Sequence, residues 1–155
     1  MSVYVAFYKG KPRPGATLRE RTKYLFDWTI RLITRSPYSH CELAIPDTTR
    51  PGVYFCVSAS VRDGGVRGKY MTLPADRWDI LPTTVTEETV YRHLRQHEGE
   101  PYDWAGVLRF ACPVLRHAQG RWFCSEFVAQ VLDMDKPHRQ TPQTVYQSLK
   151  CQAWA

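Results

Sequence analysis

The amino-acid sequence predicts one α+β domain over residues 1–155. The first observation is the order of patterns along the chain: a short strand and a helix, then a group of strands, then a group of helices, with no β-α-β alternation. The second is size and composition, because 155 residues of which 43% are hydrophobic can bury one sizeable core. The third is that 9 glycines and 11 prolines are spread along the chain, which is typical of loops between packed elements.

The N-terminal part predicts a strand and a long helix. Residues 3–8 are rich in β-branched and aromatic side chains and precede a loop with glycine and proline. Residues 18–34 are expected to form a helix, because Leu25, Trp28 and Leu32 recur at helical spacing. We expect this apolar stripe to pack against a sheet as part of the core.

The centre of the chain predicts most of the sheet. Its β-branched, aromatic and partly alternating segments are residues 40–45, 53–60, 66–73 and 78–81. A hairpin signal, Asp63-Gly64-Gly65, lies between the second and third of them. These segments predict an antiparallel meander of three or four strands within a sheet of about four to six strands.

Helices are predicted to dominate the C-terminal part. Thr86, followed by two glutamates, is expected to cap a helix that runs through residue 97 and ends at Gly99. Residues 102–115, 124–132 and 142–149 also have helical patterns. The last of these begins with Thr141 as its cap and Pro142 in its first turn. We expect these helices to pack against the antiparallel sheet.

The charge and cysteine content narrow the classes of partner. Lys and Arg outnumber Asp and Glu by 21 to 15, so the surface favours anionic partners, yet no zinc-finger, RNP or basic-zipper signature indicates nucleic-acid binding. Five cysteines without a CxxC pair argue against a disulfide framework and a structural zinc site. No apolar stretch reaches the roughly 20 residues of a spanning helix, and no signal peptide is visible, which predicts a cytoplasmic protein.

Cys124 is the candidate nucleophile. It lies where the loop before residue 124 gives way to an amphipathic helical segment. The unpaired N–H groups and partial positive charge of a helix start favour thiolate over thiol. The alternative is that Cys124 is a small buried apolar residue, as many cysteines are.

His40 is the candidate base. It begins a predicted strand on which Glu42 projects from the same face, about 7 Å along a strand that rises roughly 3.3 Å per residue. The carboxylate could then orient the imidazole and stabilise its charged form. Alternatively, His40 only caps the strand and Glu42 pairs with an arginine or with water. His93 and His97 are spaced one helical turn apart, but without the adjacent metalloprotease glutamate they indicate a solvated face.

Two blocks of the sequence resemble a known family. Residues 101–106, PYDWAG, are similar to a P-Y-x-W-G-G segment, and residues 123–128, FCSEFV, are similar to a D-C-S-G-F-V nucleophile segment. Both are segments of the NlpC-type papain-like cysteine hydrolases. Because His40 precedes Cys124, the chain resembles the circularly permuted branch found in bacteria, in phages and among lecithin:retinol-acyltransferase-like proteins. The chain departs from the family at Ala105, Phe123 and Glu126.

The resemblance implies a papain-like fold and a set of site residues. Cys124 is expected to be the nucleophile and His40 the base, while Tyr102 and Ser125 are expected near the substrate or the oxyanion. For the third residue, Ser58 is the positional match on the strand after the histidine strand. Glu42 is the stronger electrostatic partner, because a hydroxyl can fix a tautomer but supplies no countercharge.

The function implied is thiol-dependent hydrolysis of a peptide or isopeptide bond through an acyl-enzyme, without a metal or cofactor. The substrate class implied by the family is an acidic cell-wall peptide. Arg62 and Arg67 beside the predicted hairpin turn could pair with its carboxylates, or form a solvated tip. A phage-encoded enzyme acting in the host cell or virion would reconcile a cell-wall substrate with the absence of a signal peptide. Two alternatives stay open: acyl transfer between lipids, and a non-catalytic binding module.

Overall fold

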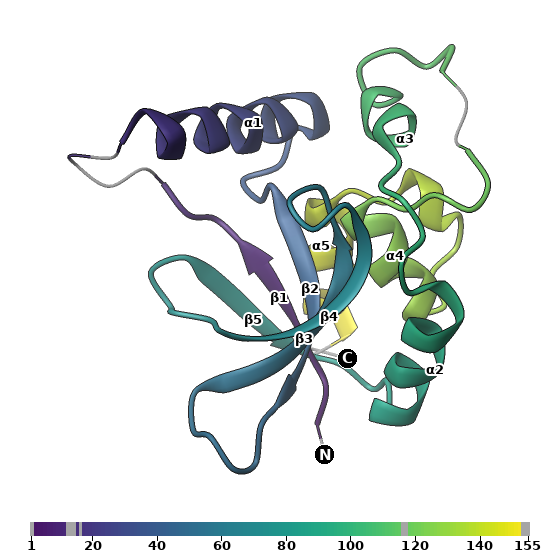
Figure 1. Ribbon diagram of the computed structural model, residues 1–155. Coiled ribbons are helices and arrows are strands. Elements are labelled where there is room, and N and C mark those ends of the chain that lie inside the picture. Colours follow the sequence, from purple (N-terminus) through teal and green to yellow (C-terminus); the bar gives the residue numbers. More distant parts are fainter. Residues whose placement is uncertain (1, 12–14, 16, 116–117, 153–155) are drawn as a thin grey trace.

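The computed structural model describes residues 2–11, 15, 17–115 and 118–152, without the side chains of residues 19, 20, 22, 23 and 26. Figure 1 shows a curved antiparallel sheet with most of the helices gathered on one side of it. The strands are β1 (Tyr4–Tyr8), β2 (His40–Pro46), β3 (Val53–Ser60), β4 (Gly65–Thr72) and β5 (Trp78–Pro82). This arrangement confirms the predicted α+β class and a sheet of five strands.

The order of strands across the sheet is β4-β3-β2-β1-β5, and every pairing is antiparallel. β2, β3 and β4 form the predicted meander. β5 does not continue it, because its backbone pairs with β1 at the other edge, with Tyr8 opposite Trp78. The N-terminal strand therefore lies inside the sheet, next to the strand that begins at His40.

The helices are α1 (Leu18–Thr34), α2 (Glu87–His97), α3 (Trp104–Leu108), α4 (Cys124–Val131) and α5 (Pro142–Gln152), with a 3-10 turn at Pro137–Arg139. The predicted helix at 102–115 is wrong in extent, because α3 ends at Leu108 and is followed by turns. Pro113 explains why helix cannot continue, since proline has no N–H and disfavours helical backbone at the preceding residue. Thr86 caps α2 as predicted, accepting a hydrogen bond from the N–H of Thr89.

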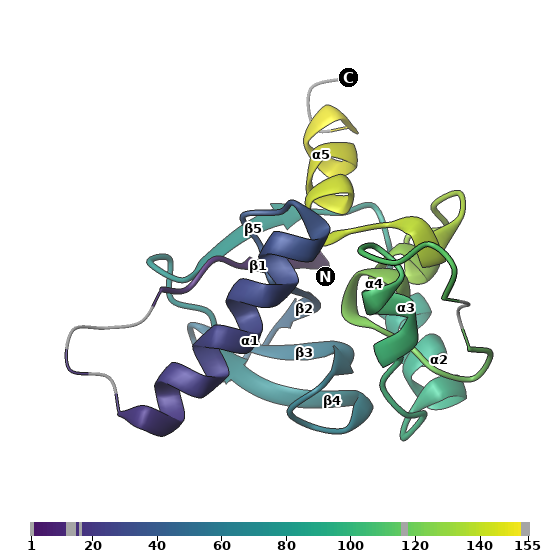
Figure 2. The ribbon, with the colours of Figure 1, turned by 90° about the horizontal axis from the view of Figure 1, so that it is seen from above.

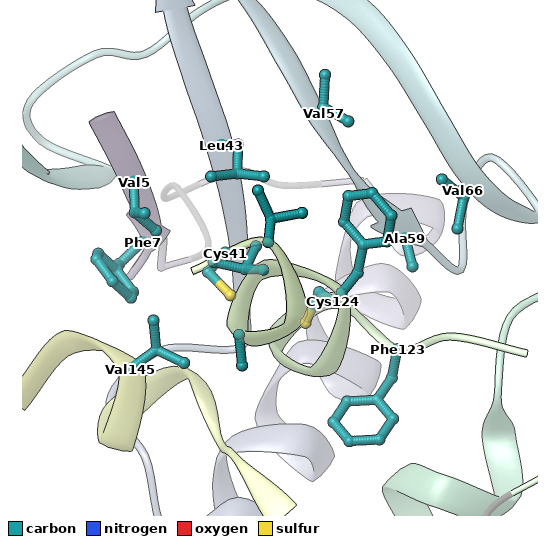
Figure 3. Close-up of a cluster of buried hydrophobic side chains, with 14 of the residues drawn as sticks. Val5, Phe7, Cys41, Leu43, Val57, Ala59, Val66, Phe123, Cys124 and Val145 are labelled. Carbon is teal, nitrogen blue, oxygen red and sulfur yellow. The ribbon is translucent and has the colours of Figure 1, made fainter. Parts of the chain in front are cut away.

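The main core lies between one face of the sheet and α4. Leu43 on β2 and Val57 on β3 pack with Phe127 and Val128 of α4, and all four side chains are buried. Figure 3 shows this layer, with α4 lying across the strands. The helix that begins at Cys124 is thereby fixed by apolar contacts over its whole length, which holds its first residue in a defined position.

The apolar stripe of α1 does not pack against the sheet, so this prediction is wrong. Leu25, Trp28 and Leu32 are 60%, 50% and 62% exposed. The opposite side of the helix faces the protein, where buried Asp27 accepts a hydrogen bond from Nη2 of Arg62 at 3.0 Å. The physical reason is that the inward side of α1 combines Asp27, which pairs with Arg62 in the turn between β3 and β4, with Ile30, which is buried in the core, so the other side faces outward. Figure 2 shows α1 crossing over the sheet.

Candidate active site

Cys124 is the first residue of α4, and the extended backbone of Phe123 (φ −108°, ψ 164°) leads into the helix. The side chain of Cys41 hydrogen-bonds to the Cys124 sulfur and is the largest influence that lowers the pKa of this thiol well below its ordinary value. Burial acts in the opposite direction, while the charge of His40 and its hydrogen bond add to the lowering. The net effect favours the thiolate, in a residue that is 4% exposed.

His40 is the first residue of β2, and its ring lies between Cys124 and Glu42. Nε2 is 2.9 Å from Oε1 of Glu42, which leaves Nδ1 for the hydrogen bond with the Cys124 side chain. Burial alone would lower the pKa of His40, but the negative sulfur and the two hydrogen bonds raise it to about 9. Both shifts act in the same sense, toward a thiolate on Cys124 and a protonated His40.

Glu42 is held in turn by Arg67, for which the sequence leaves open a contact with substrate or a solvated hairpin tip. The guanidinium makes two parallel contacts of 2.8 Å, from Nη1 to Oε2 and from Nη2 to Oε1, and its Nε donates to Asp63 at 2.7 Å. Burial would raise the pKa of Glu42, yet the contacts with His40 and Arg67 lower it to about 2. Because Arg67 is committed to these carboxylates and is 13% exposed, the alternative in which it pairs with substrate is wrong.

The strand register explains how Arg67 reaches Glu42 across an intervening strand. Arg67 on β4 is directly opposite Ser58 on β3, and Leu43 on β2 is opposite Val57, which places Glu42 beside Ser58. Successive residues of a strand point to opposite faces, so Arg67, Ser58 and Glu42 share one face. The small side chain of Ser58 leaves room for the guanidinium to pass over it.

Ser58 and Ser125, both predicted site residues, have hydroxyls that bind backbone. The Ser58 hydroxyl donates to the carbonyl of Cys41 at 2.8 Å, so the contact with the His40 ring comes from Glu42. The Ser125 hydroxyl donates to the carbonyl of Gln140 at 2.8 Å and ties α4 to the segment before α5. The side chain of Ser125 is buried and turned to that segment.

A pocket opens beside His40 and Glu42. Tyr102 lines it, and the charge of the Cys124 sulfur adds to the burial that raises the pKa of the Tyr102 hydroxyl. Arg62 is half-exposed on the rim, in contact with Asp27. The remaining lining combines aromatic and apolar side chains with polar ones: Tyr8, Ser39, Ser60, Val61, Arg67, Lys69, Met71 and Trp78.

The two sequence blocks that support the family resemblance are adjacent in space. Tyr102 forms a β-bridge with Trp122, two residues before the candidate nucleophile. Asp103 is fully buried and caps α3 through the N–H of Gly106 at 2.9 Å. A Cβ at Gly106 would lie 2.5 Å from an Asp103 oxygen and 2.9 Å from the ring of Phe123, so this glycine permits the close packing of the two blocks.

Glu126, where the family has a small residue, is buried near these blocks. Burial raises its pKa to about 8, with the charge of Asp103 acting in the same direction, while the backbone N–H of Phe123 opposes the shift. A glutamate at the third helical position that bonds back to the cap is typical of a helix start. We therefore interpret Glu126 as a stabiliser of the turn that presents Cys124.

Comparisons with protein-family models, with curated proteins and with solved structures found no match to this chain. Within the described residues, no group of three or more His, Cys, Asp or Glu side chains is placed to hold a metal ion. None of the helices described above is both long and apolar enough to cross a membrane. His93 and His97 stack at 6.2 Å, and Nδ1 of His97 contacts Glu100 at 3.0 Å.

Cys41 was not among the predicted site residues, and its contact can be tested separately. We expect Cys41→Ala to raise the pKa of Cys124, because the thiolate loses a hydrogen-bond donor. The rate of alkylation of Cys124 measured against pH should then shift to higher pH. Cys56→Ala is the matched control, since Cys56 is equally buried but lies in the cluster on the other face of the sheet. Overlapping profiles for Cys41→Ala and wild type would contradict the assignment.

Proposed function

We propose that this protein is a thiol-dependent acyl hydrolase that cleaves an amide bond, peptide or isopeptide, through an acyl-enzyme on Cys124. The observation that supports it most is the chain of contacts from Arg67 through Glu42 and His40 to the Cys124 sulfur, with His40, Glu42 and Arg67 lining a pocket. A nucleophile in contact with a base, and a carboxylate that orients this base, form the usual arrangement for nucleophilic catalysis. A papain-like, circularly permuted arrangement is the finer fold that we propose for it.

The reaction follows from the resting protonation states. The Cys124 thiolate attacks the carbonyl carbon, and N–H groups at the start of α4 stabilise the negative charge that develops on the oxygen. The imidazolium of His40 gives its proton to the leaving nitrogen as the C–N bond breaks, which leaves a thioester and neutral His40. Neutral His40 then takes a proton from water, and the hydroxide attacks the thioester. The carboxylic acid leaves, and the thiolate–imidazolium pair is restored.

The raised pKa of His40 favours an amide bond, rather than a more labile ester bond, as the bond that is cleaved in the substrate. An amine leaves only when its nitrogen is protonated, and a histidine with a pKa of about 9 holds that proton through the neutral range. An acidic peptide remains the proposed substrate class, with half-exposed Arg62 as the cation on the pocket rim.

A second candidate function is hydrolysis or transfer of a lipid acyl chain. It is favoured by the apolar side chains of Tyr8, Met71 and Trp78 in the pocket and by the exposed apolar side of α1. The two candidates differ in the product released. Amine release from peptide substrates supports the first, and fatty-acid release from phospholipid supports the second.

Selective alkylation tests the nucleophile without a known substrate. With a small alkylating reagent near pH 6, we expect Cys124 to react faster than the other four thiols by roughly tenfold or more, because its pKa is lowered well below the ordinary value. Cys112 and Cys151 are internal controls, since both are exposed and are therefore easier to reach than Cys124. Peptide mapping by mass spectrometry identifies the labelled sites. Equal labelling of all five thiols would favour the non-catalytic binding module.

A further inference from the structure

The outward side of α1 is an apolar surface that the chain itself leaves uncovered. Leu18, Leu25, Trp28 and Leu32 lie on this side at helical spacing, and each is at least half exposed. The inward side is fixed by buried Ile30, which belongs to the main core, and by polar contacts of Asp27 with Arg62 and of Arg31 with the carbonyl of Gly10 at 2.8 Å. These contacts hold the helix with its leucines and Trp28 toward solvent.

A second apolar surface lies on the same side of the molecule. It comprises four exposed or partly exposed side chains on α3 and the turns that follow: Trp104, Leu108, Val114 and Leu115. Figures 1 and 2 agree in placing α1 and α3 on one side of the molecule, and residues of the two helices are in contact. Isolated exposed hydrophobic residues are ordinary, but a contiguous group of this kind marks an interaction surface.

Each surface adjoins a residue that lines the pocket. Asp27, on the inward side of α1, lines the pocket from one side. Tyr102, whose ring lies against that of Trp104 with centroids 5.4 Å apart, lines it from the other. The pocket and the two apolar surfaces are therefore built from neighbouring residues of the same elements.

Charge distinguishes between the possible occupants. The chain carries a net charge of +6, Arg21 is exposed on the same row of α1 as the leucines, and exposed Arg35 directly follows the helix. A second copy of the chain would bring the same positive charges together. A bilayer with anionic lipids attracts these positive charges. Because its surface is fluid, a bilayer can also contact both apolar surfaces at once without shape complementarity to the protein. Leucine and tryptophan beside arginine is the composition of interfacial helices.

We propose that α1 and the segment 104–115 form a docking surface for an anionic phospholipid bilayer. Leu25, Trp28 and Leu32 enter the acyl boundary, and the arginines contact phosphate groups. The proposal goes beyond the proposed hydrolase activity and does not depend on it, because docking requires neither the Cys124 thiolate nor a bound substrate.

Vesicle flotation tests the docking surface. The full chain is mixed with vesicles of phosphatidylcholine alone or of phosphatidylcholine with phosphatidylglycerol. We expect binding to the anionic vesicles that weakens at high salt, because the exposed charges are screened. The combined variant L25Q/W28Q/L32Q should lower binding by roughly tenfold or more, since it removes the buried apolar area. The matched control is Tyr70→Gln, which replaces an exposed aromatic residue on β4 and should bind as wild type does.

Thermal unfolding checks that each variant is folded, which is expected because the three replaced side chains point into solvent. Cys124→Ala should bind vesicles like wild type, so a failure of the hydrolase proposal is separable from a failure of docking. Any of three results would overturn the docking proposal. The wild-type protein does not bind anionic vesicles at low salt, the combined variant binds them as wild type does, or the wild-type protein is a dimer that this variant converts to monomers. The last result would assign the surface to a second copy of the chain.

Discussion

Replacing His40 by glutamine should raise the pKa of Cys124 and slow its alkylation, although the hydrogen bond from Cys41 remains. The imidazolium keeps Cys124 ionised through its charge and hydrogen bond, and glutamine supplies no charge. A free thiol with a pKa of about 8.5 is less than roughly one per cent ionised at pH 6. The alkylation rate of Cys124 at pH 6 should therefore fall by about tenfold to a hundredfold, with part of the loss offset because a more basic thiolate is more nucleophilic.

The pH dependence makes this prediction specific. In wild type, alkylation should already be fast below neutral pH, because the pKa of Cys124 is lowered. In His40→Gln the rate should rise only in the alkaline range. Hydrolysis should additionally decline as pH rises through about 9, where His40 loses the proton that it gives to the leaving group. His93→Gln, on α2, is the control and should leave both profiles unchanged. A His40→Gln profile that coincides with wild type would remove the main support for the hydrolase.

The local features of the site were predictable from the sequence. His40 and Glu42 are two residues apart on a strand, and such a spacing places two side chains on one face whatever the rest of the fold does. Cys124 follows a loop and precedes an amphipathic segment, which predicts a helix start. These inferences required only the periodicity of a strand and of a helix, and the structure has the corresponding elements at these positions.

The features that depend on long-range pairing were not predictable. Arg67 reaches Glu42 only because the register of β3 and β4 places it opposite Ser58, whose side chain is small. The orientation of α1 depends on Asp27 meeting Arg62, 35 residues away in the chain. The apolar pattern of α1 predicted the helix correctly but not which side faces the protein, because periodicity is the same whether a stripe is buried or exposed.

Removal of Arg67 should have the largest effect on stability. Glu42 is 2% exposed, and Arg67→Leu would leave its carboxylate buried without its bidentate partner. Breaking a buried pair on one side costs about 3–5 kcal/mol, a large part of the 5–15 kcal/mol by which domains are typically stable. Urea unfolding at pH 7 should show this loss. Arg50→Leu is the control, because its contact with Asp47 is on the surface and should matter much less.

Acid titration and a double variant identify the cause of that loss. The folded pKa of Glu42, about 2, lies below its ordinary value of 4.5, so the stabilisation is present above about 4.5 and is lost as pH falls toward 2. The difference between wild type and Arg67→Leu should shrink over the same range. The double variant Glu42→Leu, Arg67→Leu should recover much of the stability, since no unpaired charge remains buried, although Cys124 alkylation stays slow without an oriented His40. If Arg67→Leu unfolds at the same urea concentration as Arg50→Leu, Arg67 does not hold Glu42 in place.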